Sequence, residues 1–167
     1  SLMIDGVMEP VASARVTDEL LPLLGATPLT LGRTLDTSED ADGTIVRGVV
    51  ISHELWQRRF QGDRRVIGRR LIVNNFDVQV VGVMPESFRY PFRDADLWIS
   101  MSWKPEFRSE VSFRRAQSMY GVGRLRKGVA IEEAEAEIAA IAARLETEYP
   151  ETNRLMESGA TGLQEWI

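Results

Sequence analysis

The clearest pattern of hydrophobic and polar positions lies at residues 131–149. Apolar side chains recur there at alternating steps of three and four residues, which is the period of an α-helix. Glutamates and an arginine lie on the other faces, and Pro150 follows the last apolar residue. We therefore predict an amphipathic helix over 131–149 that packs against a sheet. The apolar positions are Ile131, Ala134, Ile138, Ile141, Leu145 and Tyr149.

A second informative pattern combines a strand with a helix. A β-branched run ends at Ile51 and predicts a buried strand over 45–51. Ser52 follows and is a favourable N-cap residue. Two aromatic residues then lie one helical turn apart, so we predict a short helix over 53–60 that Ser52 caps.

After Gly62 the period changes to the alternation of strands. Leu71 and Val73 alternate with Arg70 and Ile72, and Phe76, Val78 and Val80 alternate with Asp77, Gln79 and Val81. Asn74 and Asn75 separate the two runs, and both tolerate a positive φ. This arrangement predicts a β-hairpin.

The remaining patterns are shorter, and they predict a mixture of α and β elements. The further expected elements are strands at 12–16, 96–101 and 120–125, a helix at 18–24, a long surface loop at 25–43, and irregular segments at 1–11 and after 150.

Composition limits the class of protein. With 167 residues and 44% hydrophobic content, the chain is long enough for one ordinary core. The formal net charge of -5 argues against nucleic-acid binding, which usually requires a basic surplus. Cysteine is absent, which excludes disulfides, thiolate zinc sites and a cysteine nucleophile.

The sequence offers poor material for catalysis. His53 is the only histidine, so a Ser-His-Asp triad would depend on this side chain. Ser52 precedes it, but neighbouring residues on a helix point about 100° apart, and Ser52 is expected to act as the cap. A hydrolase centred on His53 is therefore the weakest alternative, and we predict no catalytic residue.

One loop has partial similarity to a calcium site. Ser38, Asp40, Asp42 and Gly43 match the first, third, fifth and sixth positions of an EF-hand loop. The twelfth position, where a bidentate glutamate is required, is Val49. We interpret the segment as a solvated acidic loop and predict no metal site.

Two other motifs give no cofactor site. Gly121 and Gly123 lack the remaining glycines of a dinucleotide fingerprint and the Lys-Ser/Thr pair of a P-loop. Glu132 and Glu133 are adjacent carboxylates expected on an exposed helix face, and they suit the helix N-terminus rather than a catalytic cleft. We predict no cofactor-binding residue.

Arginines and aromatic residues form two further groups. The arginine cluster, with Trp56 and Phe60 interleaved, is interpreted as a solvated face, with contact to lipid headgroups or a partner as the alternative. Its members are Arg58, Arg59, Arg64, Arg65, Arg69 and Arg70. The aromatic segment 88–113 is interpreted as core, and the alternative is a small-molecule or peptide-binding module that uses it as a groove. It includes Tyr90, Phe92, Trp98, Trp103, Phe107 and Phe113.

Several segments in a fixed order resemble a known family. They read VVISHELWQRRFQGD, VIGRRLIVNNFDVQVVGVMPESFRYP and DLWISM, with LLPLLGATPLTLGRTL before them and GVGRLRKGVAIEEAEAEIAAIAARLETEYPETN after them. Together they resemble the extracytoplasmic (periplasmic) core domain of MacB-type ABC transporter permeases, nearest to the acidobacterial-type group. The resemblance covers residues 12–153, and its specificity comes from the ordered set.

The resemblance and the patterns together predict an α/β (α+β) fold with two lobes. A discontinuous α/β lobe is expected from 12–62 and 118–153, with helices on a mixed sheet. A smaller β-rich lobe is expected from 63–117, with hinges near Gly62 and Ser118. The segments 1–11 and 154–167 flank them.

The resemblance also implies a function. It implies a noncatalytic periplasmic domain of a cell inner membrane exporter, which couples cytoplasmic ATP hydrolysis to an extracytoplasmic conformational change. The implied partners are the permease's membrane helices and its ATP-binding domain or subunit, which lie outside these residues. A second permease copy and a periplasmic adaptor are further candidate partners, and nucleic acid is not one.

Overall fold

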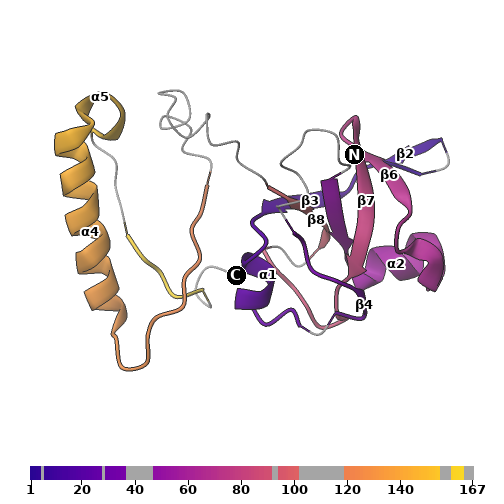
Figure 1. The fold of residues 1–167 in the computed structure, drawn as a ribbon, viewed down its shortest axis with the longest axis horizontal. Helices are drawn as coiled ribbons and strands as arrows, with labels where there is room; N and C mark the ends of the chain where they lie inside the picture. The colour runs from indigo at the N-terminus through magenta and orange to yellow at the C-terminus, as the bar shows by residue number, and fades with distance from the viewer. Residues whose placement is uncertain are drawn as a thin grey trace. The chain divides into compact units, whose positions relative to one another are not determined.

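The chain forms two compact units, Ser1–Ser102 and Trp103–Ile167 (Figure 1). The computed structural model describes residues 1–4, 6–27, 29–36, 47–91, 94–101, 119–154 and 159–163. Each unit is considered by itself below.

The first unit contains strands, two α-helices and a 3₁₀ helix. The strands are β1 (Leu2–Ile4), β2 (Val7–Glu9), β3 (Ala12–Val16), β4 (Leu31–Gly32), β5 (Arg47–Ile51), β6 (Arg70–Val73), β7 (Phe76–Val83) and β8 (Ala95–Ser100). The helices are α1 (Leu20–Leu23), α2 (His53–Phe60) and η2 (Arg64–Val66).

All the strands join one mixed sheet. Its order is β2-β1-β6-β7-β5-β8-β3, and β4 pairs with β7 beside this path. The β5–β7 and β3–β8 pairs are parallel, whereas the other pairs are antiparallel. A mixed sheet with helices confirms the predicted α+β fold class.

Each face of the sheet has its own hydrophobic core, because successive strand residues point to opposite faces. Val49 and Ile51 of β5 pack with Phe60 and other apolar residues of α2 on one face. Val50 lies on the other face, in a cluster that includes Trp98. The sheet is therefore covered on both sides over its central strands.

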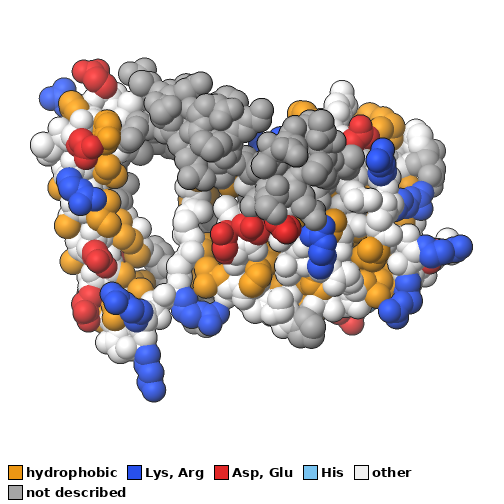
Figure 2. All heavy atoms as spheres, in the orientation of Figure 1, with side chains coloured by type: hydrophobic (Ala, Val, Ile, Leu, Met, Phe, Trp, Pro, Cys, Tyr) orange, Lys and Arg blue, Asp and Glu red, His pale blue; other side chains and the backbone are white. Residues whose placement is uncertain are grey.

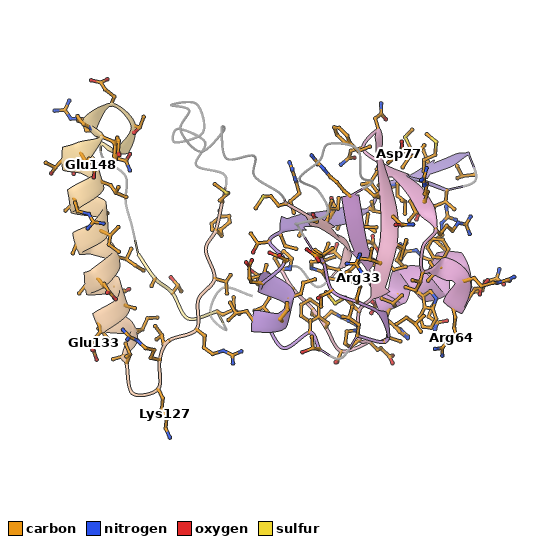
Figure 3. All side chains as sticks on the ribbon, viewed as in Figure 1. Arg33, Arg64, Asp77, Lys127, Glu133 and Glu148 are labelled. Atoms are coloured by element: carbon orange, nitrogen blue, oxygen red, sulfur yellow. The ribbon has the colours of Figure 1, made fainter. Side chains whose placement is uncertain are left out.

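The second unit contains α4 (Ile131–Glu148) and α5 (Pro150–Asn153). Hydrophobic side chains are visible along α4 in Figure 2, and the helix has no buried residue. Glu133 lies near the start of α4 and Glu148 at its end (Figure 3). The structure confirms a helix here, while its predicted packing on a sheet stays a prediction.

Several predicted elements are confirmed in place. The predicted strand 12–16 coincides with β3, and the helix 53–60 coincides with α2. The hairpin is formed by β6 and β7, and both turn residues have positive φ, 48° at Asn74 and 66° at Asn75. The structure of these elements is set by residues close in sequence, so local patterns are sufficient to predict them.

Other predictions need correction. Residues 1–11, expected to be irregular, contain the β1–β2 pair, which is too short to show a pattern and is held by pairing of β1 with β6. The predicted surface loop 25–43 contains β4, which pairs with β7. The segment 120–125, predicted as a strand, is not one. A Cβ added at Gly121 or Gly123 would have no neighbour within 4 Å, so these glycines are not sites of close packing.

The sheet also changes the predicted division into lobes. Strands β6, β7 and β8 were expected in a separate lobe, but β7 and β8 both pair with β5. Gly62 therefore lies within the first unit and not at its border. The alternation of a hairpin shows that its two strands pair with each other but not which strands lie on their other sides. This is why the pairing of β7 and β8 with β5 was not predicted. Ser118 lies outside the described residues, and the association of 118–153 with 12–62 stays a prediction.

Candidate functional site

A cleft of about 640 Å³ lies in the first unit, where the beginnings of β3, α2 and β8 meet. Its position results from strand direction: β3 and β8 are parallel neighbours, and β5, which leads into α2, is antiparallel to β8. The cleft is lined by Pro10, Val11, Ala12, Ser52, Glu54, Arg58, Asp94, Ala95 and Asp96.

Ser52 fixes the beginning of α2 at the cleft. Its Oγ accepts a hydrogen bond from the Leu55 backbone N–H at 3.0 Å, which confirms the predicted N-cap. Its own backbone N–H donates to the Asp96 carbonyl oxygen at 2.8 Å. The beginning of the helix is therefore tied to the beginning of strand β8.

The carboxylates of the cleft differ in their partners. Asp96 pairs with Arg58 at 3.1 Å, and Glu54 pairs with Arg89. Asp94 is exposed and forms no ion pair with any of the described residues. The cleft thus keeps one carboxylate that is available to a cationic group.

The structure gives Ser52 and His53 separate roles. Ser52 is 3% exposed and its hydroxyl oxygen is engaged at the helix N-terminus. The His53 ring contacts Trp56 edge-on, with centroids 5.5 Å apart, and His53 does not line the cleft. The two residues are therefore not arranged as a nucleophile and its base.

The described part of the aromatic segment belongs to the core. Trp98 is 1% exposed, and its Nε1–H donates to the Tyr90 carbonyl oxygen at 2.8 Å. Phe88 packs edge-on against Trp98 with centroids 5.5 Å apart. Burial raises the pKa of the Tyr90 phenol above its ordinary value. Trp98 therefore supports the core interpretation, whereas Phe92, Trp103, Phe107 and Phe113 lie outside the described residues.

Several described arginines of the cluster form ion pairs with carboxylates of the same unit. Arg59 lies 2.9 Å from Glu9, and Arg65 lies 3.0 Å from Asp63. The hydrogen bond from the Arg65 side chain lowers the pKa of the Asp63 carboxyl. Arginine side chains gather around the end of the unit that carries α2 (Figure 2), where Figure 3 labels Arg64. These contacts support the interpretation of a solvated, ion-paired face.

The other candidate motifs also receive structural roles or lie outside the described chain. The Glu133 carboxylate accepts a hydrogen bond from the Ala130 backbone N–H at 3.3 Å, so it caps α4. Ser38, Asp40, Asp42 and Gly43 are not among the described residues. Within the parts that are described, no three His, Asp or Glu side chains are grouped to hold a metal ion.

Sequence reasoning missed the cleft itself. Its charged residues Glu54, Arg58, Asp94 and Asp96 come from segments that the sheet brings together. The Arg58–Asp96 pair joins residues 38 positions apart. No local spacing could have indicated these contacts.

Comparison with known proteins identifies the family. The sequence profile described as MacB-like periplasmic core domain matches residues 4–141. The chain belongs to this family. The match confirms the resemblance found in the ordered sequence segments, although a comparison with curated protein sequences finds no match.

Two solved structures share the fold of this MacB-like domain. The periplasmic region of MacB from Actinobacillus actinomycetemcomitans matches with a TM-score of 0.56 and 15% identity, over 91% of this chain and 64% of that chain. A domain of a protein assigned as a permease in Porphyromonas gingivalis matches with a TM-score of 0.55 and 19% identity, over 90% of this chain and 67% of that chain. This chain thus spans less than two thirds of the MacB region. None of its described helices is long and apolar enough to cross a bilayer.

Proposed function

We propose that this chain is a noncatalytic periplasmic domain of an ABC transporter permease in the cell inner membrane. In this proposal the domain couples cytoplasmic ATP hydrolysis to an extracytoplasmic conformational change during export. The observation that carries the proposal is the family match over residues 4–141. Likeness of fold to the MacB periplasmic region supports it.

The charges of the cleft support a noncatalytic role. Turnover by acid–base chemistry requires groups with different protonation behaviour that face one reacting atom. Here Arg58 pairs with Asp96 and Arg89 pairs with Glu54, so two of the three carboxylates are held in ion pairs. The cleft therefore suits contact with a partner better than chemistry on a substrate.

The first unit has the properties of a mechanical element. One continuous sheet carries a hydrophobic core on each face. Close-packed cores resist deformation, so such a unit moves as a rigid body and transmits a displacement applied at its surface. The partners in this proposal are the permease's membrane helices and its ATP-binding domain or subunit. A second permease copy and a periplasmic adaptor are the further partners proposed.

Hydrogen exchange in the full-length permease tests the coupling. The permease, reconstituted in nanodiscs, is compared in its nucleotide-free and ATP-trapped states by mass spectrometry. We expect exchange at surface segments of this domain to differ between the states, while β5 and β7 stay protected in both because they are central strands.

A permease with an inactive ATP-binding part is the matched control. In that variant, addition of ATP followed by the same trapping step should leave exchange in residues 1–167 unchanged. Identical exchange in the two states of the active permease would show that ATP hydrolysis is not coupled to this domain.

A further inference from the structure

Strand β3 is an edge of the sheet that the described strands form. It ends the strand order and pairs on one side with β8, and no other described strand pairs with it. The opposite edge strand, β2, has three residues, whereas β3 has five. Of the two edge strands in the described part of the chain, β3 therefore offers the longer set of main-chain groups that no described strand pairs.

The direction of these groups follows from the parallel pairing. The Val16 carbonyl oxygen accepts from the Met101 N–H at 2.9 Å, so Val16 faces β8. In a parallel ladder alternate residues of a strand bond to the same neighbour. Ala14 therefore also faces β8, and the N–H and C=O groups of Ser13 and Arg15 point to the open edge.

The edge has few features that oppose pairing. Exposed edges are usually protected by proline, charged side chains, bulges or short length. β3 contains no proline and one charged residue, Arg15. A register shift lies between Ala12 and Ser13, which leaves the regular part from Ser13 onward open to an added strand.

The cleft adjoins the beginning of this edge. Ala12, the first residue of β3, lines the cleft together with Asp94. The charged lining consists of three carboxylates and one guanidinium, from Glu54, Asp94, Asp96 and Arg58. Arg58 and Arg89 pair with Asp96 and Glu54, so within the described residues Asp94 is the cleft carboxylate that remains to complement a cationic side chain.

We propose that β3 is a docking site for an extended polypeptide segment of a partner protein. The segment adds as a further strand along Ser13 and Arg15, and a lysine or arginine at its end reaches the cleft carboxylates. Main-chain hydrogen bonds supply binding and the basic residue supplies specificity, as in other cases of strand addition. Such docking does not require the transport function proposed above.

The test uses synthetic peptides and the isolated chain. The probes are capped peptides of about eight alternating Thr and Val residues, a typical strand length, with Lys at either end. Matched peptides carry Glu in place of Lys. Binding is followed by amide chemical shifts in NMR. We expect a Lys peptide to shift the Ser13 and Arg15 amides and to bind about tenfold more tightly than its Glu counterpart.

Three variants locate the site. Arg15→Pro removes an outward N–H and should abolish binding, while the amide spectrum reports whether the sheet persists. Asp94→Lys leaves the strand unaltered and should remove the preference for Lys over Glu. Asp77→Lys makes the same charge change at an exposed residue of β7 outside the cleft, labelled in Figure 3, and should preserve the preference.

The outcomes are decisive in both directions. Shifts at Ser13 and Arg15 with a Lys preference that depends on Asp94 support the docking site, even if Arg15→Pro does not fold. The proposal is overturned if neither Lys peptide shifts these amides. It is also overturned if Lys and Glu peptides bind equally, or if the shifts centre on β2. Loss of ATP coupling in the full permease has no bearing on these measurements.

Discussion

Gly82 should be intolerant of any side chain, although its backbone conformation is ordinary. It lies in β7 opposite Gly32 of β4. A Cβ added at Gly82 would lie 2.4 Å from the Arg33 carbonyl oxygen and 2.6 Å from Leu29 Cδ1. The neighbouring backbone must therefore move if Gly82 is replaced by alanine.

That movement is resisted by hydrogen bonds on both sides of the contact. The Thr30 N–H donates to Val83 O at 3.0 Å, and the Arg33 N–H donates to Val81 O at 2.9 Å. Overpacking costs about 1–3 kcal/mol. Weakening one of these bonds adds about 0.5–1.5 kcal/mol. We expect Gly82→Ala to lower the free energy of unfolding by about 2–4 kcal/mol, or about 5–15 °C in Tm.

Gly48→Ala is the matched control, because Gly48 also lies in a central strand and also adjoins Val81. Its added Cβ would be 3.5 Å from the nearest Val81 methyl, which is ordinary contact. We expect its Tm to stay within about 4 °C of the wild type, since alanine also costs less strand entropy than glycine. Thermal unfolding is followed by near-ultraviolet circular dichroism, which reports on buried tryptophans. Equal Tm values for the two variants would refute the proposed steric cause.

Four further predictions follow from single contacts. Ser52→Ala should lower the free energy of unfolding by about 1 kcal/mol in chemical denaturation, because the Leu55 N–H loses its 3.0 Å acceptor. Trp98→Phe should lower it by about 1–3 kcal/mol in the same assay, because the buried 2.8 Å hydrogen bond from the Trp98 Nε1–H to the Tyr90 carbonyl is lost. Because the pKa of Tyr90 is raised in the folded state, its phenol ionises at a lower pH in the unfolded chain than in the folded one, and the free energy of unfolding should fall as pH rises above about 10. Tyr90→Phe should reduce this fall in alkaline denaturation. The pKa of Asp63 is lowered in the folded state, so the contribution of this carboxylate to stability is complete above pH 3.8, its ordinary pKa, and is lost as pH falls through the lower folded-state pKa. Arg65→Gln should raise the pKa of Asp63, which an NMR titration measures.

Elements that depend on neighbouring residues were predictable from the sequence. The cap at Ser52 and the turn at Asn74 and Asn75 are set by side chains within a few positions. The helix from Ile131 to Glu148 is long enough for its period to be unmistakable. In contrast, β1 and β2 have three residues each; β1 is held by pairing with the distant strand β6, and β2 by pairing with β1.

The sheet order was not predictable, because alternation shows which side chains face a core but not which strand lies alongside. β7 illustrates the difficulty: it pairs with β6 through a local turn, but its partners β5 and β4 come from earlier segments. Gly82 is the one residue in the sequence of β7 that reflects its close approach to β4. A glycine within a strand indicates that another backbone comes close, without identifying that backbone.

The cleft shows how strand direction can position a surface feature. Because β3 and β8 are parallel neighbours, their first residues Ala12 and Ala95 are directly paired. Because β5 is antiparallel to β8, its end at Ile51 lies opposite Leu97, and α2 must begin beside Asp96. The location of the cleft therefore follows from topology, whereas its charge is set by individual side chains such as the exposed Asp94. Shape and charge can thus vary independently, so a shared sheet could present differently charged clefts to different partners.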